Sequence, residues 1–208
     1  MAADTDEFNR LHALGLSIPA IFDVLNGKRD EMTELREAAE SKAVDKWCKG
    51  RKNIPQSLTA LWDLSPENFY LAFDGDAPHE HNPDHFILIE AQIADVHQKL
   101  TYNASRDKDP WHKKYKSKSC RTAYRWVHGL SVTPPIIRRF QDQIHIDGGM
   151  HRYHLAQTYQ TLRMPFLVRK DDSGEVLEIL PSGTIIWSPP VASPPPVSGD
   201  NPDQPKQA

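Results

Sequence analysis

The segment from Gln143 to Val168 constrains the fold of this chain more than any other. It opens with Ile144 and Ile146 alternating with polar side chains, which is the pattern of a short strand. Two glycines follow, residues 150–162 then have the apolar spacing of a helix, and residues 166–168 indicate a second strand. A strand, a glycine turn, a helix and a strand in this order predict a βαβ unit with two parallel strands.

The start of this helix has the chemistry of an anion-binding site. The first N–H groups of a helix have no backbone partner and lie at the positive end of its dipole. Gly148 and Gly149 allow a phosphate to approach the backbone, and His151 and Arg152 add cations where a helix disfavours them unless an anion binds. Asp147, at the end of the strand, could hold a metal ion or a water. In the alternative, Asp147 only pairs with Arg152 and the glycines only form a tight turn.

The formal net charge of -3 hides an uneven distribution of charge. Residues 101–170 carry 14 basic and 4 acidic side chains, whereas residues 1–100 carry 10 basic and 18 acidic ones. A segment with this excess of positive charge is typical of a surface that binds phosphate, either free or in nucleic acid.

The strongest run of basic residues, within residues 103–126, is interleaved with aromatic residues. Cations that follow a phosphate backbone, with aromatic rings available for stacking, are the chemistry of single-stranded and non-specific DNA binding. The predicted DNA-binding residues are Lys113, Lys114, Lys116, Lys118, Arg121 and Arg125, and the aromatic residues between them are Trp111, Tyr115, Tyr124 and Trp126. In the alternative, the cations are a solvated face and the aromatic residues pack on the core.

The sequence SVTPPI at 131–136, followed by a strand and by GGMHRY at 148–153, resembles the ParB/sulfiredoxin superfamily. In that superfamily a short glycine-containing box opens a helix and contacts nucleotide phosphates. The resemblance implies that Gly148, Gly149, His151 and Arg152 bind nucleotide phosphates, and that Asp147, His151 and Arg152 are catalytic.

One departure from the superfamily removes one activity. Met150 stands where sulfiredoxins have their catalytic cysteine, and a thioether cannot form the thiolate that sulfinic-acid reduction requires. In length and architecture the chain is most similar to plasmid fertility-inhibition proteins of the Osa/FiwA type. That resemblance implies an ATPase and DNA-cleaving nuclease that uses ATP or another NTP with magnesium, and that inhibits plasmid or T-DNA transfer by conjugation systems. Its partners would be a nucleotide, non-specific DNA and a component of the transfer machine. The alternative is a non-catalytic regulator that binds nucleotide or DNA and occludes a partner protein.

Taken together, these patterns predict an α+β protein in three parts. Residues 1–63 form a helical arm, with a long helix from Asp30 to Trp47. Residues 64–188 form the ParB/sulfiredoxin-like domain, whose first strand is expected at 86–93 and which ends in a short acidic strand pair after Val168. Residues 189–208, rich in proline, are predicted to be a disordered tail.

The histidines outside residues 143–168 do not match a standard metal-binding motif. His79, His81 and His85 share one loop, but their spacing matches no zinc motif, so a polar surface loop is the prediction and a metal site the alternative. Within residues 143–168, His154 is placed by the helical pattern on the polar side of its helix.

Two cysteines, Cys48 and Cys120, are too few for a disulfide framework and favour a reducing compartment. No stretch approaches the ~20 apolar residues that span a bilayer, and the first ten residues lack the layout of a secretory signal. We therefore predict a cytoplasmic protein with no membrane span.

Overall fold

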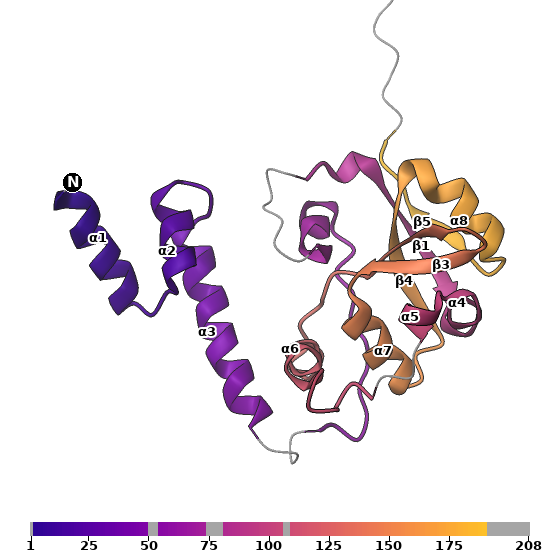
Figure 1. The fold of residues 1–208 in the computed structure, drawn as a ribbon, viewed down its shortest axis with the longest axis horizontal. Helices are drawn as coiled ribbons and strands as arrows, with labels where there is room; N and C mark the ends of the chain where they lie inside the picture. The colour runs from indigo at the N-terminus through magenta and orange to yellow at the C-terminus, as the bar shows by residue number, and fades with distance from the viewer. Residues whose placement is uncertain (1, 50–53, 74–80, 106–108, 191–208) are drawn as a thin grey trace, which may run out of the picture.

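The computed structural model describes residues 2–49, 54–73, 81–105 and 109–190 of the 208. The chain folds into a mixed α+β core that carries three N-terminal helices as an arm on one side (Figure 1). Residues 191–208, which include most of the predicted proline-rich tail, lie outside the described residues, as do Asp74, Asp76, His79 and Glu80 of the histidine loop.

The arm consists of α1 (Ala2–Ala13), α2 (Ile18–Leu25) and α3 (Glu31–Cys48). Two of these helices begin at residues whose side chains cap them: Ser17 Oγ accepts from the N–H of Ala20, and a carboxylate oxygen of Asp30 accepts from the N–H of Thr33 at 2.9 Å. Pro19 lies in the first turn of α2, where its missing N–H costs no hydrogen bond. Local signals thus determine where the arm helices begin.

The arm has a small apolar cluster of its own around Leu11, Leu16 and Ile21. It joins the core where α3 packs against α6 (Lys116–Val127) (Figure 1). Residues 54–63, which the sequence assigned to the arm, instead pack on the core, since Asp63 N–H donates to Val132 O and Leu58 lies against the main apolar cluster.

The core is built on a five-stranded sheet with the order β3-β2-β4-β1-β5. The strands are β1 (Phe86–Gln92), β2 (Ile136–Phe140), β3 (Gln143–Gly148), β4 (Arg163–Arg169) and β5 (Thr184–Trp187). All neighbouring pairs are antiparallel except β2 and β4.

The predicted parallel pairing within the 143–168 segment is wrong. β3 forms an antiparallel hairpin with β2 at the edge of the sheet, and it is β2 that lies parallel to β4. The hairpin turns over Gln141 and Asp142, with Gln141 at a φ of 57°, which is uncommon for a residue other than glycine. Because this turn contains no glycine, the sequence pattern did not reveal it.

The helices around the sheet are α4 (Ile93–Lys99), α5 (Tyr102–Ser105), α6, α7 (Met150–Thr158) and α8 (Ser173–Ile179), with short 3-10 helices at Pro66–Ala72 (η2), Pro83–His85 (η4) and Lys170–Asp172 (η5). The strand at 86–93 is confirmed, as β1. The acidic strand pair after Val168 is wrong, because a helix, α8, precedes the single strand β5. The predicted helix at 150–162 ends at Thr158, because Gln160 adopts a φ of 58°.

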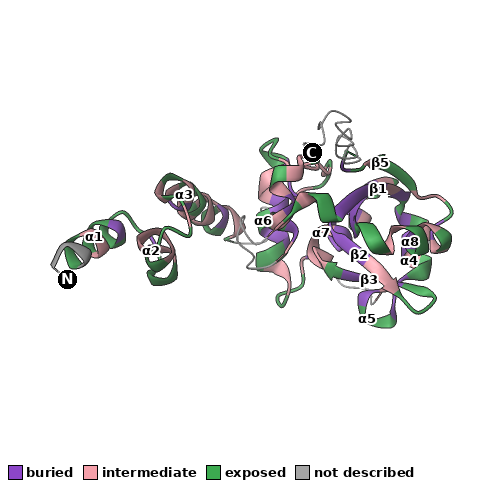
Figure 2. Ribbon diagram, turned by 90° about the horizontal axis from the view of Figure 1, so that it is seen from above, coloured by how far each residue is buried: buried purple, intermediate pink, exposed green. Residues whose placement is uncertain are grey.

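Apolar side chains pack against both faces of the sheet. Buried residues accordingly lie along its central strands (Figure 2). Along β1, Ile87, Ile89 and Ala91 enter the main cluster beneath the helices, while Phe86 and Leu88 join a smaller cluster with Phe69 of η2 on the other face. Alternate residues of one strand therefore stabilise two layers. No helix among the described residues is long and apolar enough to cross a membrane.

Candidate phosphate-binding site

The glycines before α7 are required by close packing. Gly149 has a φ of 79°, and a Cβ built there would lie 2.7–2.9 Å from the guanidinium atoms of Arg152. A Cβ on Gly148 would lie 2.5 Å from the carbonyl oxygen of Ala72. Both positions therefore need glycine whether or not a phosphate binds.

Arg152 is half-buried and points back across the turn. Its Nη1 donates to the carbonyl oxygen of Thr133 at 2.6 Å, and its Nη2 donates to that of Ala72 at 3.2 Å. These carbonyls belong to the segment before β2 and to the end of η2, so the side chain joins three parts of the chain. Arg152 thus has a structural role in addition to any contact with a ligand, and Arg152→Ala is expected to destabilise the fold.

Asp147 pairs with Arg138 and not with Arg152, the partner that the sequence suggested as an alternative to a phosphate site. Its Oδ1 accepts from Arg138 Nε at 2.8 Å and lies 3.9 Å from His145 Nε2. Asp147 forms no ion pair with Arg152 or His151 among the described residues. The register of β2 and β3 shifts beside it, so Asp147 is the extra residue of a β-bulge, a feature that redirects side chains.

His151 brings the start of α7 next to the start of α6. Its ring lies 5.7 Å from that of Tyr115, centroid to centroid, and Tyr115 is the residue before the first turn of α6. Neither helix has an acidic residue in its first turn. Two positive helix ends therefore meet at one place, although they come from parts of the sequence about 35 residues apart.

A cavity of about 270 Å³ lies beside this junction and is lined by Ile54, Trp111, Lys113 and Lys116. Lys116 is also the first residue of α6, so the cavity and the helix end share a cation. Lys114 extends the positive surface, with its Nζ 5.5 Å from the centre of the Tyr115 ring. We define the candidate site as Trp111, Lys113, Lys116, Tyr115 and His151.

The predicted DNA-binding residues divide into two groups. Lys113, Lys114, Lys118 and Arg121 are exposed, whereas Arg125 is engaged by the arm through Glu40 and also donates to Ser131 O. Among the aromatic residues, Trp126 is buried and donates to Leu61 O, and Tyr124 packs on Trp47. The alternative of core packing is correct for Trp126, while Tyr124 packs on the arm. Trp111 lines the cavity and also packs against the main cluster, and Tyr115 lies beside the site.

Sequence reasoning missed Ser119. This residue lies one turn after Tyr115 on α6, is fully buried, and its Oγ makes no hydrogen bond with the described residues. Residues four apart share a helix face, so the Ser119 hydroxyl lies on the face of α6 that meets α7. The sequence shows a serine directly after Lys118 near the start of the helix, but it does not show that this serine is buried.

A second hollow, of about 650 Å³, lies at the other end of α7, between α4 and the start of β4, and sequence reasoning also missed it. His97 and Gln157 line it, and His97 Nδ1 accepts from Gln157 Nε2 at 3.0 Å. The hydroxyl of buried Tyr153 lies 3.3 Å from the same nitrogen, and burial raises the pKa of this tyrosine.

The histidines do not form a metal site in the part of the chain that the structure describes. His154 is buried rather than on a polar surface, which corrects the sequence expectation, and His81 stacks on Phe86 with ring centroids 4.9 Å apart. No group of three or more potential ligands converges among the described residues. Magnesium prefers several oxygen ligands, and Asp147 is already held by Arg138, so these residues do not fit a magnesium ion held by the protein.

Comparisons with known proteins assign no function to the chain. No family model, no curated protein and no solved structure matches the chain.

Proposed function

We propose that this protein binds the phosphate groups of nucleotides and of DNA at the junction of α6 and α7, as a member of the ParB/sulfiredoxin superfamily. The observation that carries the proposal is the contact between Tyr115 and His151, which places two helix N-termini side by side within the most basic part of the chain. The positive end of each helix dipole favours an anion, and the lysines around the two ends supply further positive charge.

The surroundings of the junction support an extended phosphate ligand. Lys113, Lys114 and Arg121 are exposed and form no ion pair with any residue that the structure describes. A strand of DNA would gain from such cations, because each phosphate contact releases condensed counterions. Trp111, half-buried at the cavity, offers a ring edge or face to a base or ribose.

Binding without turnover is the function that this geometry supports best. The carboxylate to which the resemblance gives a catalytic role, Asp147, is paired with Arg138 and not with the residues at the start of α7. The protein would then act as a cytoplasmic regulator that occludes DNA or a component of a plasmid or T-DNA transfer machine.

Hydrolysis of ATP or cleavage of DNA is the second candidate. It is favoured by the pairing of Asp147 with His145, whose Nε2 lies 3.9 Å from Oδ1, since a carboxylate and an imidazole on one strand can together position a water. The catalytic residues that the resemblance implies, Asp147, His151 and Arg152, would then act on a phosphate held at the junction.

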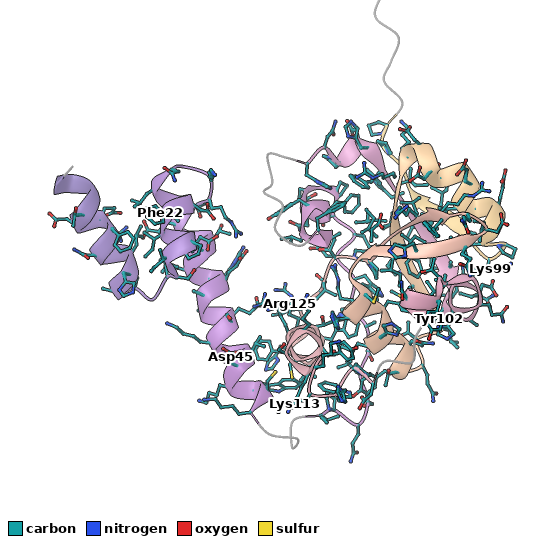
Figure 3. All side chains as sticks on the ribbon, in the orientation of Figure 1. Phe22, Asp45, Lys99, Tyr102, Lys113 and Arg125 are labelled. Atoms are coloured by element: carbon teal, nitrogen blue, oxygen red, sulfur yellow. The ribbon has the colours of Figure 1, made fainter. Side chains whose placement is uncertain are left out.

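The proposal is tested by titrating ATP and a single-stranded oligonucleotide into the full chain by calorimetry. The variant Lys113→Gln/Lys116→Gln should lose about tenfold or more in affinity, and the salt slope for the oligonucleotide should fall by about 0.7 for each phosphate contact removed. The matched control is Lys99→Gln, because Lys99 is an exposed lysine on α4, on the other side of the core from Lys113 (Figure 3).

Equal losses in the variant and the control would refute a localised site. Phosphate release and plasmid nicking, measured with the wild type and with Asp147→Asn, separate the two candidates. Turnover that Asp147→Asn abolishes, with binding retained, would replace the regulator by the hydrolase.

A further inference from the structure

The arm is attached to the core along an antiparallel contact between α3 and α6. Near the middle of α3, both carboxylate oxygens of Glu40 accept from Arg125 Nη1 at 2.8 Å. Further along α3, the ring of Trp47 meets that of Tyr124 edge to face, with centroids 6.0 Å apart. The end of α3 therefore lies beside the earlier part of α6.

The next pair in this order consists of the two cysteines. Cys48 is the last residue of α3 and is half-buried, whereas Cys120 is 1% exposed on α6. Both are free thiols, and the Cys48 thiol lies close enough to that of Cys120 for the two to interact. The only two cysteines of the chain thus come from the arm and from the core and meet at the interface between them.

We propose that Cys48 and Cys120 form a reversible disulfide that fastens the arm to the core under oxidising conditions. The pair is a modification site whose co-reactant is a peroxide. Cytoplasmic disulfides are usually of this transient kind rather than structural. The site does not depend on the phosphate-binding function proposed above.

The chemistry assigns a different role to each thiol. Cys48, the more accessible, attacks hydrogen peroxide as a thiolate; the O–O bond breaks, Cys48 becomes a sulfenic acid and hydroxide leaves. The Cys120 sulfur then attacks the Cys48 sulfur, the S–OH bond breaks, and the proton of Cys120 leaves with the hydroxyl group as water. In total two thiols lose two electrons and one peroxide becomes two waters.

The surroundings of Cys48 determine how readily the pair reacts. Burial raises the pKa of Cys48 to about 12, and the interaction with Cys120 acts in the same direction. Asp45 on its own helix also raises this pKa, while Lys116 across the interface on α6 lowers it. The thiolate is therefore scarce at neutral pH, so the bridge forms under sustained oxidation, and its rate should rise with pH because the thiolate fraction rises.

The test is oxidation of the reduced full chain with hydrogen peroxide, followed by alkylation and intact-mass measurement without reductant. A monomer that has lost two hydrogens (about 2 Da) and takes up no alkylating agent is expected, together with a tryptic peptide that joins residues 48 and 120. The rate at pH 8.5 should exceed that at pH 7 roughly 30-fold, the ratio of the thiolate fractions. Hydrogen exchange of the α3 amides should slow in the oxidised form and recover on reduction.

The controls use each cysteine separately. Cys48→Ser should leave Cys120 unreactive, because it is buried, and Cys120→Ala should allow Cys48 to accumulate as a sulfenic acid that dimedone traps. Two results would overturn the proposal. The first is the formation of disulfide-linked dimers without the internal bridge. The second is a wild-type protein in which Cys48 is over-oxidised while Cys120, after denaturation, still reacts with the alkylating agent. An internal bridge with unchanged exchange in α3 would contradict the fastening of the arm.

Discussion

Replacing Gly149 by alanine should detach Arg152 from the carbonyls that it holds. The new Cβ would lie 2.7–2.9 Å from three atoms of the guanidinium group, which is closer than any real contact of this kind. The guanidinium is the end of a flexible side chain, so it can move, but only by giving up its hydrogen bonds to Thr133 and Ala72. The effect of Gly149→Ala should therefore depend on whether Arg152 is present.

The magnitudes come from two terms. An alanine held at a φ of 79° costs about 1–2 kcal/mol of strain. The carbonyl groups of Thr133 and Ala72 belong to buried residues and would lose the guanidinium as their charged donor. This loss costs about 2–3 kcal/mol. We expect a loss of unfolding free energy of about 3–5 kcal/mol for Gly149→Ala, about 2–3 kcal/mol for Arg152→Ala, and no more for the double variant than for Gly149→Ala.

The assay is urea unfolding of the wild type, the two single variants and the double variant, analysed as a double-mutant cycle. Gly129→Ala is the matched control, because Gly129 has a φ of 72° and a Cβ there would meet nothing within 4 Å. It should cost only the strain of about 1–2 kcal/mol. Additive losses at Gly149 and Arg152, or equal losses at Gly149 and Gly129, would refute the reasoning.

Two further predictions concern the arm and the pH dependence. In a double-mutant cycle of Glu40→Ala and Arg125→Ala, the coupling energy should be about 0.5–1 kcal/mol, because both side chains are partly exposed. Arg125→Ala should destabilise the protein more than Glu40→Ala, since it also removes the hydrogen bond to Ser131 O. A coupling energy of zero would mean that the ion pair does not hold the arm. The unfolding free energy should fall as the pH rises above about 10, because burial raises the pKa of Tyr153 and Tyr159 and the unfolded chain loses these protons first. Urea unfolding at pH 8.5 and 10.5 should show a smaller decline in Tyr159→Phe, and an equal decline would contradict this.

Local patterns predicted most elements but not their pairing. The capped start of α3, the strand β1 and the glycine turn into α7 were all visible in the sequence, because each depends on neighbouring residues. The parallel partner of β4 was misassigned, because a hairpin without glycine returned the chain to the sheet edge. The helix α8 was interpreted as a strand, since a segment of seven residues is too short for its apolar spacing to distinguish a helix from a strand.

The candidate site was predicted in part. The two predicted parts of the site, the basic stretch and the start of α7, lie together in the structure, because Tyr115 contacts His151. The assignment of cations was less successful, because Arg125 is neutralised by Glu40, 85 residues earlier. Ser119 escaped notice because its burial depends on how α6 packs on the rest of the fold, which no local pattern reveals.

The sequence by itself determined that positive charge and a glycine-led helix start are concentrated within residues 101–170, since charge and turn chemistry are properties of the residues themselves. The tertiary structure alone decided which of these residues are available to a ligand. Arg152 is bound by carbonyls 19 and 80 positions away, and Cys48 meets Cys120 only because α3 packs on α6. Partners that are distant in sequence are chosen by packing, and packing is a property of the whole fold.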